Sequence, residues 1–524
     1  MHDSIQLPEI APFRAISPVP RRNQRHSLIV VLQVAAPILA GRITFPLLLL
    51  TSGLLLVRPC AGQTRAQDTY VAQATSEWGT ATLIETNTSS ADGSKLGMDA
   101  DGNAIAVWSQ GDGTYVSVWA NRYVAGVGWG AATLIESKRG DVKKPQVAMD
   151  ARGNATAVWV QTDETKFNVW ANRYVASVGW GRASLIETNP GDANMPRVAV
   201  DGKGNAMALW KQSNGVNYDI WANRYDVGSG WGTATLIESN PENASETWVA
   251  MDNSGNAMAL WRQSDGVDLS IWANRYDVGS GWGTPTLIEP NPGFASFPHV
   301  EFDESGNAIV VWYQDFPSAS RPSASRRSIW ANRYVVGSGW GTPTLISTDS
   351  SNAQGASLAM DRIGNATATW RQGSDGDTSI WANRYDVGSG WGTATLVETA
   401  PGDAVWPDVA MDRSGNAMTV WSQFDGTYTS IWANLYVVGS GWGTATLIET
   451  QPDNADLPKV EMDGRGNAVA VWAQAGSIWA NRFSTVQILT EMGEGIETIK
   501  KEPPPGERRQ LPRRHHGRWE GEPW

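Results

Sequence analysis

The sequence predicts an all-β protein, an eight-bladed β-propeller of four-stranded blades. The first reason is a repeat, because the tripeptide Trp-Ala-Asn occurs eight times. Successive copies lie 51 residues apart, except for one interval of 58 and a last interval of 47. The second reason is that each repeat contains several short strand-like segments separated by Gly-rich turns. A period near 50 residues with several strands per unit is typical of a propeller.

Each repeat divides into four expected strands, and the third repeat illustrates them. A short inner strand covers 198–201, a second strand 206–212, a third strand 220–225 and an outer strand 231–238. The motif Asp-x-x-Gly-Asn joins the first two strands in all eight repeats, and we expect its Asp to cap a tight turn. Trp is absent from the expected inner strand but recurs in the other strands. The repeated Trp side chains are therefore expected to pack between blades that diverge outward.

The order of the half-repeats predicts how the ring closes. Residues 78–85 read Trp-Gly-Thr-Ala-Thr-Leu-Ile-Glu, which is the end of a repeat, yet they precede the first complete copy. The last repeat stops at Phe483 without this ending. We therefore expect residues 78–85 to complete the last blade and to leave no open sheet edge. The predicted propeller covers residues 78–483.

The segments outside the repeats predict export. Residues 1–66 are basic and then apolar, which is typical of a signal peptide or an N-terminal membrane anchor. Residues 67–77 are interpreted as a linker, and residues 484–524, rich in Pro, Arg and Glu, as a disordered tail. We expect an extracellular or cell-surface protein, with the periplasm as an alternative. We expect a monomer that contacts a membrane only through an uncleaved N-terminal segment.

Composition argues against several classes of function. The net charge is −12 although the first 66 residues are basic, so the repeats are strongly acidic and unsuited to nucleic acid. The single cysteine, Cys60, precedes the repeats, and His299 is the only histidine within them. We therefore expect no metal site, no cofactor and no histidine base.

The repeat motifs resemble those of secreted bacterial β-propeller proteins. The resemblance covers residues 78–483 and rests on Met-Asp-x-x-Gly-Asn-Ala, Trp-Ala-Asn-Arg-Tyr and Gly-Trp-Gly-x-x-Thr-Leu-Ile-Glu. The motifs are also loosely similar to NHL repeats and to the Asp-box hairpins of sialidases. The Asp-box has Ser before its Asp and Thr-Trp after its Gly, where this chain has Met-Asp and Gly-Asn-Ala. The resemblance implies a propeller fold.

Strand direction places the nearly identical turns on one face of the ring and the variable loops on the other, which we call the variable face. Recognition usually resides in variable loops on a rigid scaffold. We expect Trp248 and Trp406 at loop tips on this face, with aromatic neighbours in the next loop. Two Glu residues replace the usual Ala or Gly near the central channel and could hold a cation or water. The candidate ligand-binding residues are Trp248, Trp406, Phe294, Phe297, Glu301 and Glu461. Ordinary loop packing for the aromatics, and a wide wet channel for the Glu residues, remain the alternatives.

These observations favour an exported, non-catalytic propeller that binds a ligand or partner, with a glycan or a protein as the expected ligand. Nearly all polar residues of the blades are repeated, and no nucleophile–base pair occurs once. We therefore expect no catalytic residues and no enzyme. The alternatives are a sialidase-like glycoside hydrolase and a purely structural surface protein.

Overall fold

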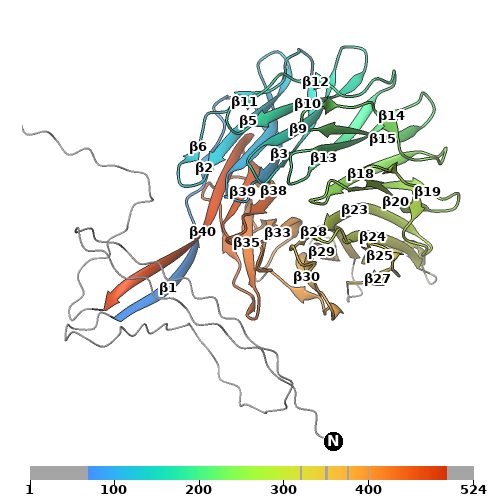
Figure 1. Ribbon diagram of the computed structural model, residues 1–524. Helices are drawn as coiled ribbons and strands as arrows, with labels where there is room; N and C mark the ends of the chain where they lie inside the picture. Colours follow the sequence, from blue (N-terminus) through green and yellow to red (C-terminus); the bar gives the residue numbers. More distant parts are fainter. Residues whose placement is uncertain (1–68, 319–320, 348–351, 375–376, 399, 493–524) are drawn as a thin grey trace, which may run out of the picture. The chain divides into compact units, whose positions relative to one another are not determined.

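The computed structural model describes residues 69–318, 321–347, 352–374, 377–398 and 400–492. These residues form eight all-β blades arranged as a propeller ring, which confirms the predicted fold class (Figure 1). The predicted signal or anchor segment, residues 1–66, lies outside the described residues, and so do residues 493–524 of the predicted tail. In the described part of the chain, no helix is long and apolar enough to cross a membrane.

The third blade shows the common plan. Its innermost strand is β13 (Ala193–Val200), followed by β14 (Ala206–Ser213) and β15 (Tyr218–Asp226). The outer edge consists of two short pieces that both pair with β15, namely β16 (Gly230–Trp231) and β17 (Thr235–Leu236). The expected outer strand is thus divided, because the residues between the two pieces leave the ladder.

The other blades follow the same order. Blades 1 to 8 are numbered by their inner strands: β3 (Ala91–Met98), β8 (Val142–Met149), β13, β18 (Ala244–Met251), β23 (Phe294–Phe302), β28 (Asn352–Met360), β33 (Ala404–Met411) and β38 (Ala455–Met462). The second strands are β4 (Ala104–Gly111), β9 (Ala155–Thr162), β14, β19 (Ala257–Ser264), β24 (Ala308–Ser318), β29 (Ala366–Ser374), β34 (Ala417–Phe424) and β39 (Ala468–Gln474). The third strands are β5 (Val116–Val124), β10 (Phe167–Val175), β15, β20 (Leu269–Asp277), β25 (Arg321–Val335), β30 (Asp377–Asp386), β35 (Thr429–Val437) and β40 (Ser477–Met492). The remaining outer pieces of blades 1 to 7 are β6 (Gly128–Trp129), β7 (Thr133–Leu134), β11 (Gly179–Trp180), β12 (Ser184–Leu185), β21 (Gly281–Trp282), β22 (Thr286–Leu287), β26 (Gly339–Trp340), β27 (Thr344–Leu345), β31 (Gly390–Trp391), β32 (Thr395–Leu396), β36 (Gly441–Trp442) and β37 (Thr446–Leu447).

Blade 8 contains strands from both ends of the described chain. Strand β2 (Thr82–Leu83) pairs with β40, with Leu83 opposite Trp479, just as Leu236 lies opposite Trp221 in blade 3. Around the ring, each inner strand contacts the next, and β38 contacts β3.

The residues beside this junction differ from the sequence interpretation. Strand β1 (Thr69–Trp78) pairs along its whole length with β40, from Thr69 opposite Met492 to Trp78 opposite Phe483. The described parts of the expected linker and of the expected disordered tail therefore form an antiparallel ladder. Both segments are rich in β-branched and aromatic residues, which favour strands, and the ladder of blade 8 continues directly into them.

The core lies between blades, as predicted for the repeated Trp. The Trp near the end of each second strand is fully buried; these are Trp108, Trp159, Trp210, Trp261, Trp312, Trp370, Trp421 and Trp472. Trp210, for example, packs in one cluster with Val158 and Ile186 of blade 2. The Trp of each Trp-Ala-Asn motif is partly buried instead, as at Trp221 and Trp272.

Repeated polar residues tie turns and blades together. In blade 3, Oδ1 of Asp201 accepts hydrogen bonds from the backbone N–H groups of Lys203 and Asn205, each at 2.9 Å, as expected for a turn cap. Nδ2 of Asn223 donates to the carbonyl of Ile186 in blade 2 at 2.8 Å. Equivalent bonds recur at the other blade junctions, so the same contacts join every pair of neighbours.

Candidate functional site

Every inner strand contains a bulge near the variable face. In β13 the pairing with β14 shifts between Asn194 and Arg197, and Met195 between them has a φ of 51°. We call the residues equivalent to Met195 the bulge residues. Six of them are not Gly: Lys144, Met195, Glu246, Phe297, Trp406 and Leu457, with φ between 51° and 54°. This left-handed conformation costs roughly 1–2 kcal/mol for a residue with a side chain. The backbone strain therefore occurs at the equivalent position, the bulge, of six inner strands.

Two residues beyond each bulge, the inner strands carry side chains that differ almost completely between blades. We call this set the channel ring: Lys95, Gln146, Arg197, Trp248, His299, Ser357, Asp408 and Lys459. In a molecule whose blades otherwise repeat, packing alone would require similar residues here. The channel ring is therefore the candidate functional site.

One arc of the channel ring is a stack of side chains from blades 2 to 5. Nη1 of Arg197 donates to Oε1 of Gln146 at 3.1 Å, and its guanidinium lies 4.3 Å from the centre of the Trp248 ring. The other side of Trp248 faces His299, with ring centres 4.0 Å apart. Nδ1 of His299 accepts from the backbone N–H of Leu358 at 3.2 Å, so its Nε2 carries the proton and donates to Glu301 at 3.3 Å.

The opposite arc is centred on Asp408. Its carboxylate accepts from Nζ of Lys459 at 2.7 Å and from the backbone N–H of Val460 at 2.9 Å. Oγ of Ser357 adds a weaker bond at 3.3 Å. Blades 6, 7 and 8 are thus joined through one carboxylate.

Burial shifts the pKa of several groups in the channel. Lys95 is partly accessible at its surface but is enclosed by the inner strands. This burial lowers its pKa to about 7, and the positive charges of Lys459 and Arg197 add to the effect. Burial raises the pKa of Glu461 to about 8, and the nearby carboxylates of Asp408 and Glu301 add to this effect. Burial also lowers the pKa of Arg197 to about 10.

The candidate aromatic residues occupy different environments. Trp406 and Phe297 are bulge residues with 51% and 57% of their surface exposed, and Phe294 at the start of β23 is 49% exposed. Trp248, by contrast, lies within β18 and is partly buried between Arg197 and His299. The expectation that Trp248 and Trp406 stand at loop tips is wrong for both, because the inner strands β18 and β33 begin earlier than the sequence pattern indicates.

The two candidate carboxylates both face the channel, where Glu301 contributes to the raised pKa of Glu461. Among the described residues, no group of three or more His, Cys, Asp or Glu side chains is placed to hold a metal ion.

A cavity of about 240 Å³ lies at the turn end of the channel, lined by Met98, Met360, Met411 and Met462 and by residues of the adjoining turns. The channel is therefore hollowed at the end opposite to the bulge residues.

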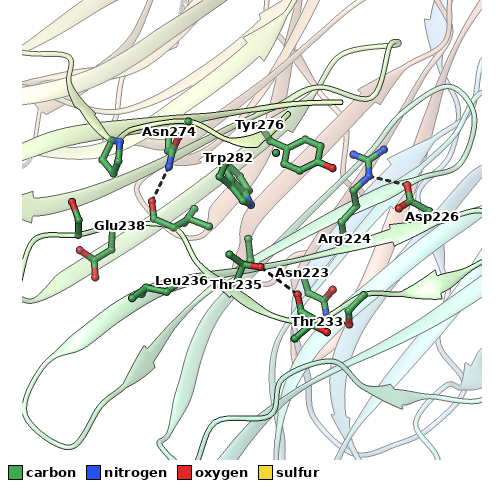
Figure 2. Close-up of a pocket in the computed structure, with 17 residues that line it drawn as sticks. Asn223, Arg224, Asp226, Thr233, Thr235, Leu236, Glu238, Asn274, Tyr276 and Trp282 are labelled. Carbon is green, nitrogen blue, oxygen red and sulfur yellow. Dashed lines mark hydrogen bonds and ion pairs between the residues drawn. The ribbon is translucent and has the colours of Figure 1, made fainter. Parts of the chain in front are cut away.

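A second cavity, of about 650 Å³, lies at the outer edge between blades 3 and 4 (Figure 2). Figure 2 shows Tyr276 beside Trp282, and the ion pair between Arg224 and Asp226, whose atoms are 2.8 Å apart. Most residue types of this lining recur at the other junctions. Blade packing accounts for this cavity better than a specific site does.

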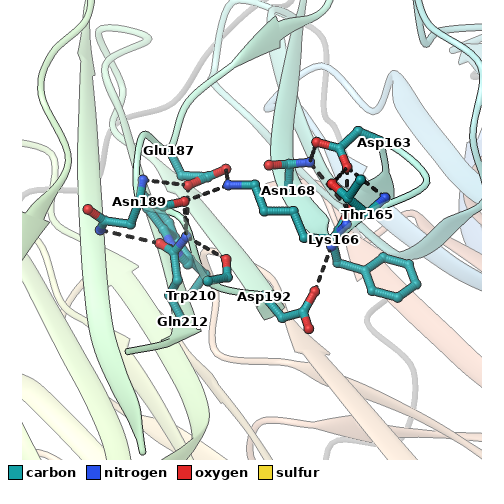
Figure 3. A network of polar contacts seen from close by, with 11 residues as sticks. Asp163, Thr165, Lys166, Asn168, Glu187, Asn189, Asp192, Trp210 and Gln212 are labelled. Carbon is teal, nitrogen blue, oxygen red and sulfur yellow. Dashed lines mark hydrogen bonds and ion pairs between the residues drawn. The ribbon is translucent and has the colours of Figure 1, made fainter. Parts of the chain in front are cut away.

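Polar networks also hold the loops of the variable face (Figure 3). Nε2 of Gln212 donates to Oε2 of Glu187 at 2.7 Å and to the carbonyl of Gly191 at 3.0 Å, while Oε1 accepts from the indole of Trp210 at 3.0 Å. Asp192 accepts from the backbone N–H of Phe167 at 2.8 Å. The scaffold beneath the site is therefore fixed by buried hydrogen bonds.

No family model matches the chain, and a comparison with curated proteins finds no match. Several solved propellers are similar in structure. A polysaccharide lyase of family PL25, an ulvan lyase, has 12% identity and a TM-score of 0.44, over 63% of this chain and 90% of the lyase. The leech intramolecular trans-sialidase has 9% identity and a TM-score of 0.34, over 74% and 83%. A GH93 α-L-arabinofuranosidase of Fusarium graminearum has 10% identity and a TM-score of 0.36, over 78% and 97%.

The expectation that this protein is not an enzyme is corrected by these findings. The solved structures found to be similar are mostly glycoside hydrolases and lyases, at 9–12% identity. The channel ring also holds polar side chains that the blades do not repeat, in contrast to the expected repetition of nearly all polar residues. At these identities the likeness extends to the fold alone. The chain is an eight-bladed β-propeller.

Proposed function

We propose that the protein binds a saccharide at the variable-face end of its channel, with the channel ring as the floor of the site. The observation that carries this proposal is the loss of repetition in the channel ring. Side chains that differ between otherwise similar blades suit a ligand without eightfold symmetry. Such a ligand would meet a distinct set of donors and acceptors in each orientation.

The exposed aromatic bulge residues support a saccharide in particular. Trp406 and Phe297 each expose about half of their surface, and the guanidinium of Arg371 lies 5.8 Å from the centre of the Trp406 ring. Aromatic faces flanked by polar groups suit sugar rings. Their strained backbone keeps these side chains at the rim of the site.

Catalysis on the bound saccharide is the second candidate function, and Glu461 favours it. A carboxylic acid with a pKa of about 8 keeps its proton at neutral pH and is able to donate it. Asp408 and Glu301 lie close enough to contribute to that raised pKa, which gives the channel carboxyl groups in different environments.

The test is binding to a glycan array, combined with product analysis on the same glycans. We expect Trp406→Ala to weaken binding about tenfold, the amount expected for one lost aromatic contact, while the melting temperature stays unchanged. Ile363→Ala is the matched control, because Ile363 is 72% exposed in a turn on the other face. Equal effects of the two substitutions on binding would contradict the proposal, as would an array with no bound glycan.

A further inference from the structure

Three neighbouring blades present hydrogen-bond donors to the channel without a matching acceptor. Arg197 uses Nη1 for Gln146 and Nε for the carbonyl of Thr247, at 3.1 Å and 3.2 Å, and its Nη2 makes no hydrogen bond within the described residues. Because Oε1 of Gln146 accepts from Arg197, the other polar atom of this side chain, Nε2, is a hydrogen-bond donor. Nζ of Lys95 bonds only to the carbonyl of Ser94, at 3.1 Å.

The charges of this arc are not balanced by ion pairs. In the described part of the chain, no carboxylate lies within ion-pair distance of Arg197 or Lys95, whereas Lys459 is neutralised by Asp408. Lys144, the bulge residue of blade 2, adds a further cation near Arg197. A buried cation without a partner is costly, and an anion between the blades would remove much of that cost.

The repulsion among these cations is visible in Lys95. Lys459 and Arg197 both lower its pKa, while Asp408 and Asp92 act in the opposite direction without outweighing burial. Lys143 and Lys144 are the charged groups on the adjacent strand β8, and Glu461 on β38 is uncharged below about pH 8. An anion placed here would favour the protonated form of Lys95.

We propose that Lys95, Gln146 and Arg197, from blades 1, 2 and 3, form a binding site for an oxyanion, that is, a carboxylate or sulfate group. The site goes beyond the proposed saccharide binding, because it takes a free oxyanion as well as one carried by a sugar. Lys and Arg supply the charge, and the guanidinium donates from a fixed plane held against Trp248.

The experiment is calorimetric titration of the full chain with sodium sulfate, sodium glucuronate and glucose at constant ionic strength. We expect sulfate and glucuronate to bind with a saturable isotherm and glucose not to compete with them. Binding requires protonated Lys95, so the affinity falls as pH rises above about 7. Between pH 6.0 and pH 8.5 the loss is about 30-fold for one coupled proton. Ionisation of Glu461 above pH 8 acts in the same direction.

Variants separate this site from general salt effects. Lys95→Gln and Arg197→Gln should each abolish the saturable binding, whereas Lys203→Gln, at an exposed turn of blade 3, should retain it. If Arg197→Gln does not fold, Lys95→Gln still decides, because the side chain of Lys95 makes a single hydrogen bond to the described residues.

Absence of saturable sulfate binding would overturn the oxyanion site, as would binding that is independent of pH or unchanged in both variants. Glucuronate binding that depends on Trp406 but not on Lys95 would likewise overturn it. That last result would leave the proposed saccharide binding intact, so the two proposals fail separately.

Discussion

The hydrogen bonds of Gln212 allow a sharp test of what stabilises the blades. Gln212→Ala removes the acceptor of the Trp210 indole and the donor to the Gly191 carbonyl. Two other partners of Gln212 retain a hydrogen bond. Glu187 still accepts from the backbone N–H of Asn189 at 2.9 Å, and the carbonyl of Asn189 still accepts from Nζ of Lys166 at 2.6 Å. The Trp210 indole and the Gly191 carbonyl are therefore left without these partners, and Nδ2 of Asn189 loses a weak bond of 3.5 Å.

The matched control is Gln372 in blade 6, which is equally buried but less well bonded. Its Oε1 accepts from the Trp370 indole at 2.7 Å, yet its Nε2 has no hydrogen-bond partner within the described residues. Ser347 stands where blade 3 uses the carboxylate of Glu187. Each buried group left unpaired costs about 1–3 kcal/mol. We expect Gln212→Ala to lower the free energy of unfolding by about 3–5 kcal/mol and Gln372→Ala by about 1–2 kcal/mol.

Urea unfolding, with the midpoint compared at equal slope, measures both changes. The two side chains have the same size and nearly the same exposure, 1% and 2%, so the cavity left behind is similar. Equal losses in the two variants would refute the assignment to hydrogen bonds and would point to side-chain volume instead.

Two further predictions concern blade 4. Trp261→Ala should cost about 3–5 kcal/mol, and Trp272→Ala clearly less, because Trp261 is fully buried and Trp272 is partly exposed; equal shifts in urea midpoint would contradict this. Glu289 has its pKa raised to about 7 by burial, so the folded protein holds a proton that the unfolded chain releases above about pH 4.5. Its contribution to stability is therefore present below pH 4.5 and lost as pH rises through 7. Glu289→Gln should gain stability over the parent at pH 8, by roughly 1–3 kcal/mol, but not at pH 4, as measured by urea midpoints.

The blade scaffold could be predicted from the sequence because its contacts repeat. The Asp-x-x-Gly-Asn turn occurs in every copy, so the role of Asp201 as a cap followed from residue type and spacing. The Asn of the Trp-Ala-Asn motif likewise occurs in every copy, and Asn223 joins two blades. These contacts are local or lie one repeat away, and an eightfold pattern makes them visible.

The channel ring was not identified from the sequence, because the bulge interrupts the strand pattern just before it. An extra residue at Met195 breaks the alternation of β13, so the sequence pattern indicated only residues 198–201 as strand. Trp248, equivalent to Arg197, was therefore interpreted as a loop residue. The available signal was the alignment of the eight repeats, in which the column of Arg197 contains seven different residue types, while the adjacent columns of Pro196 and Val198 contain four and two.

The repeated Asn side-chain bonds that join neighbouring blades do not distinguish one blade from another. The amide of Asn223 meets the carbonyl of Ile186 just as Asn274 meets Ile237 and Asn434 meets Val397, all at 2.8 Å. Through these repeated bonds a blade accepts any neighbour, including one from another chain, whereas the channel ring provides contacts that differ between junctions. During refolding at high concentration, we expect blades to be exchanged between chains and rings to close with the wrong complement. The channel ring would then combine inner strands of blades that are not neighbours in the native order, although the blades themselves would pack normally. Such a preparation would look folded by spectroscopy and still lack the channel site.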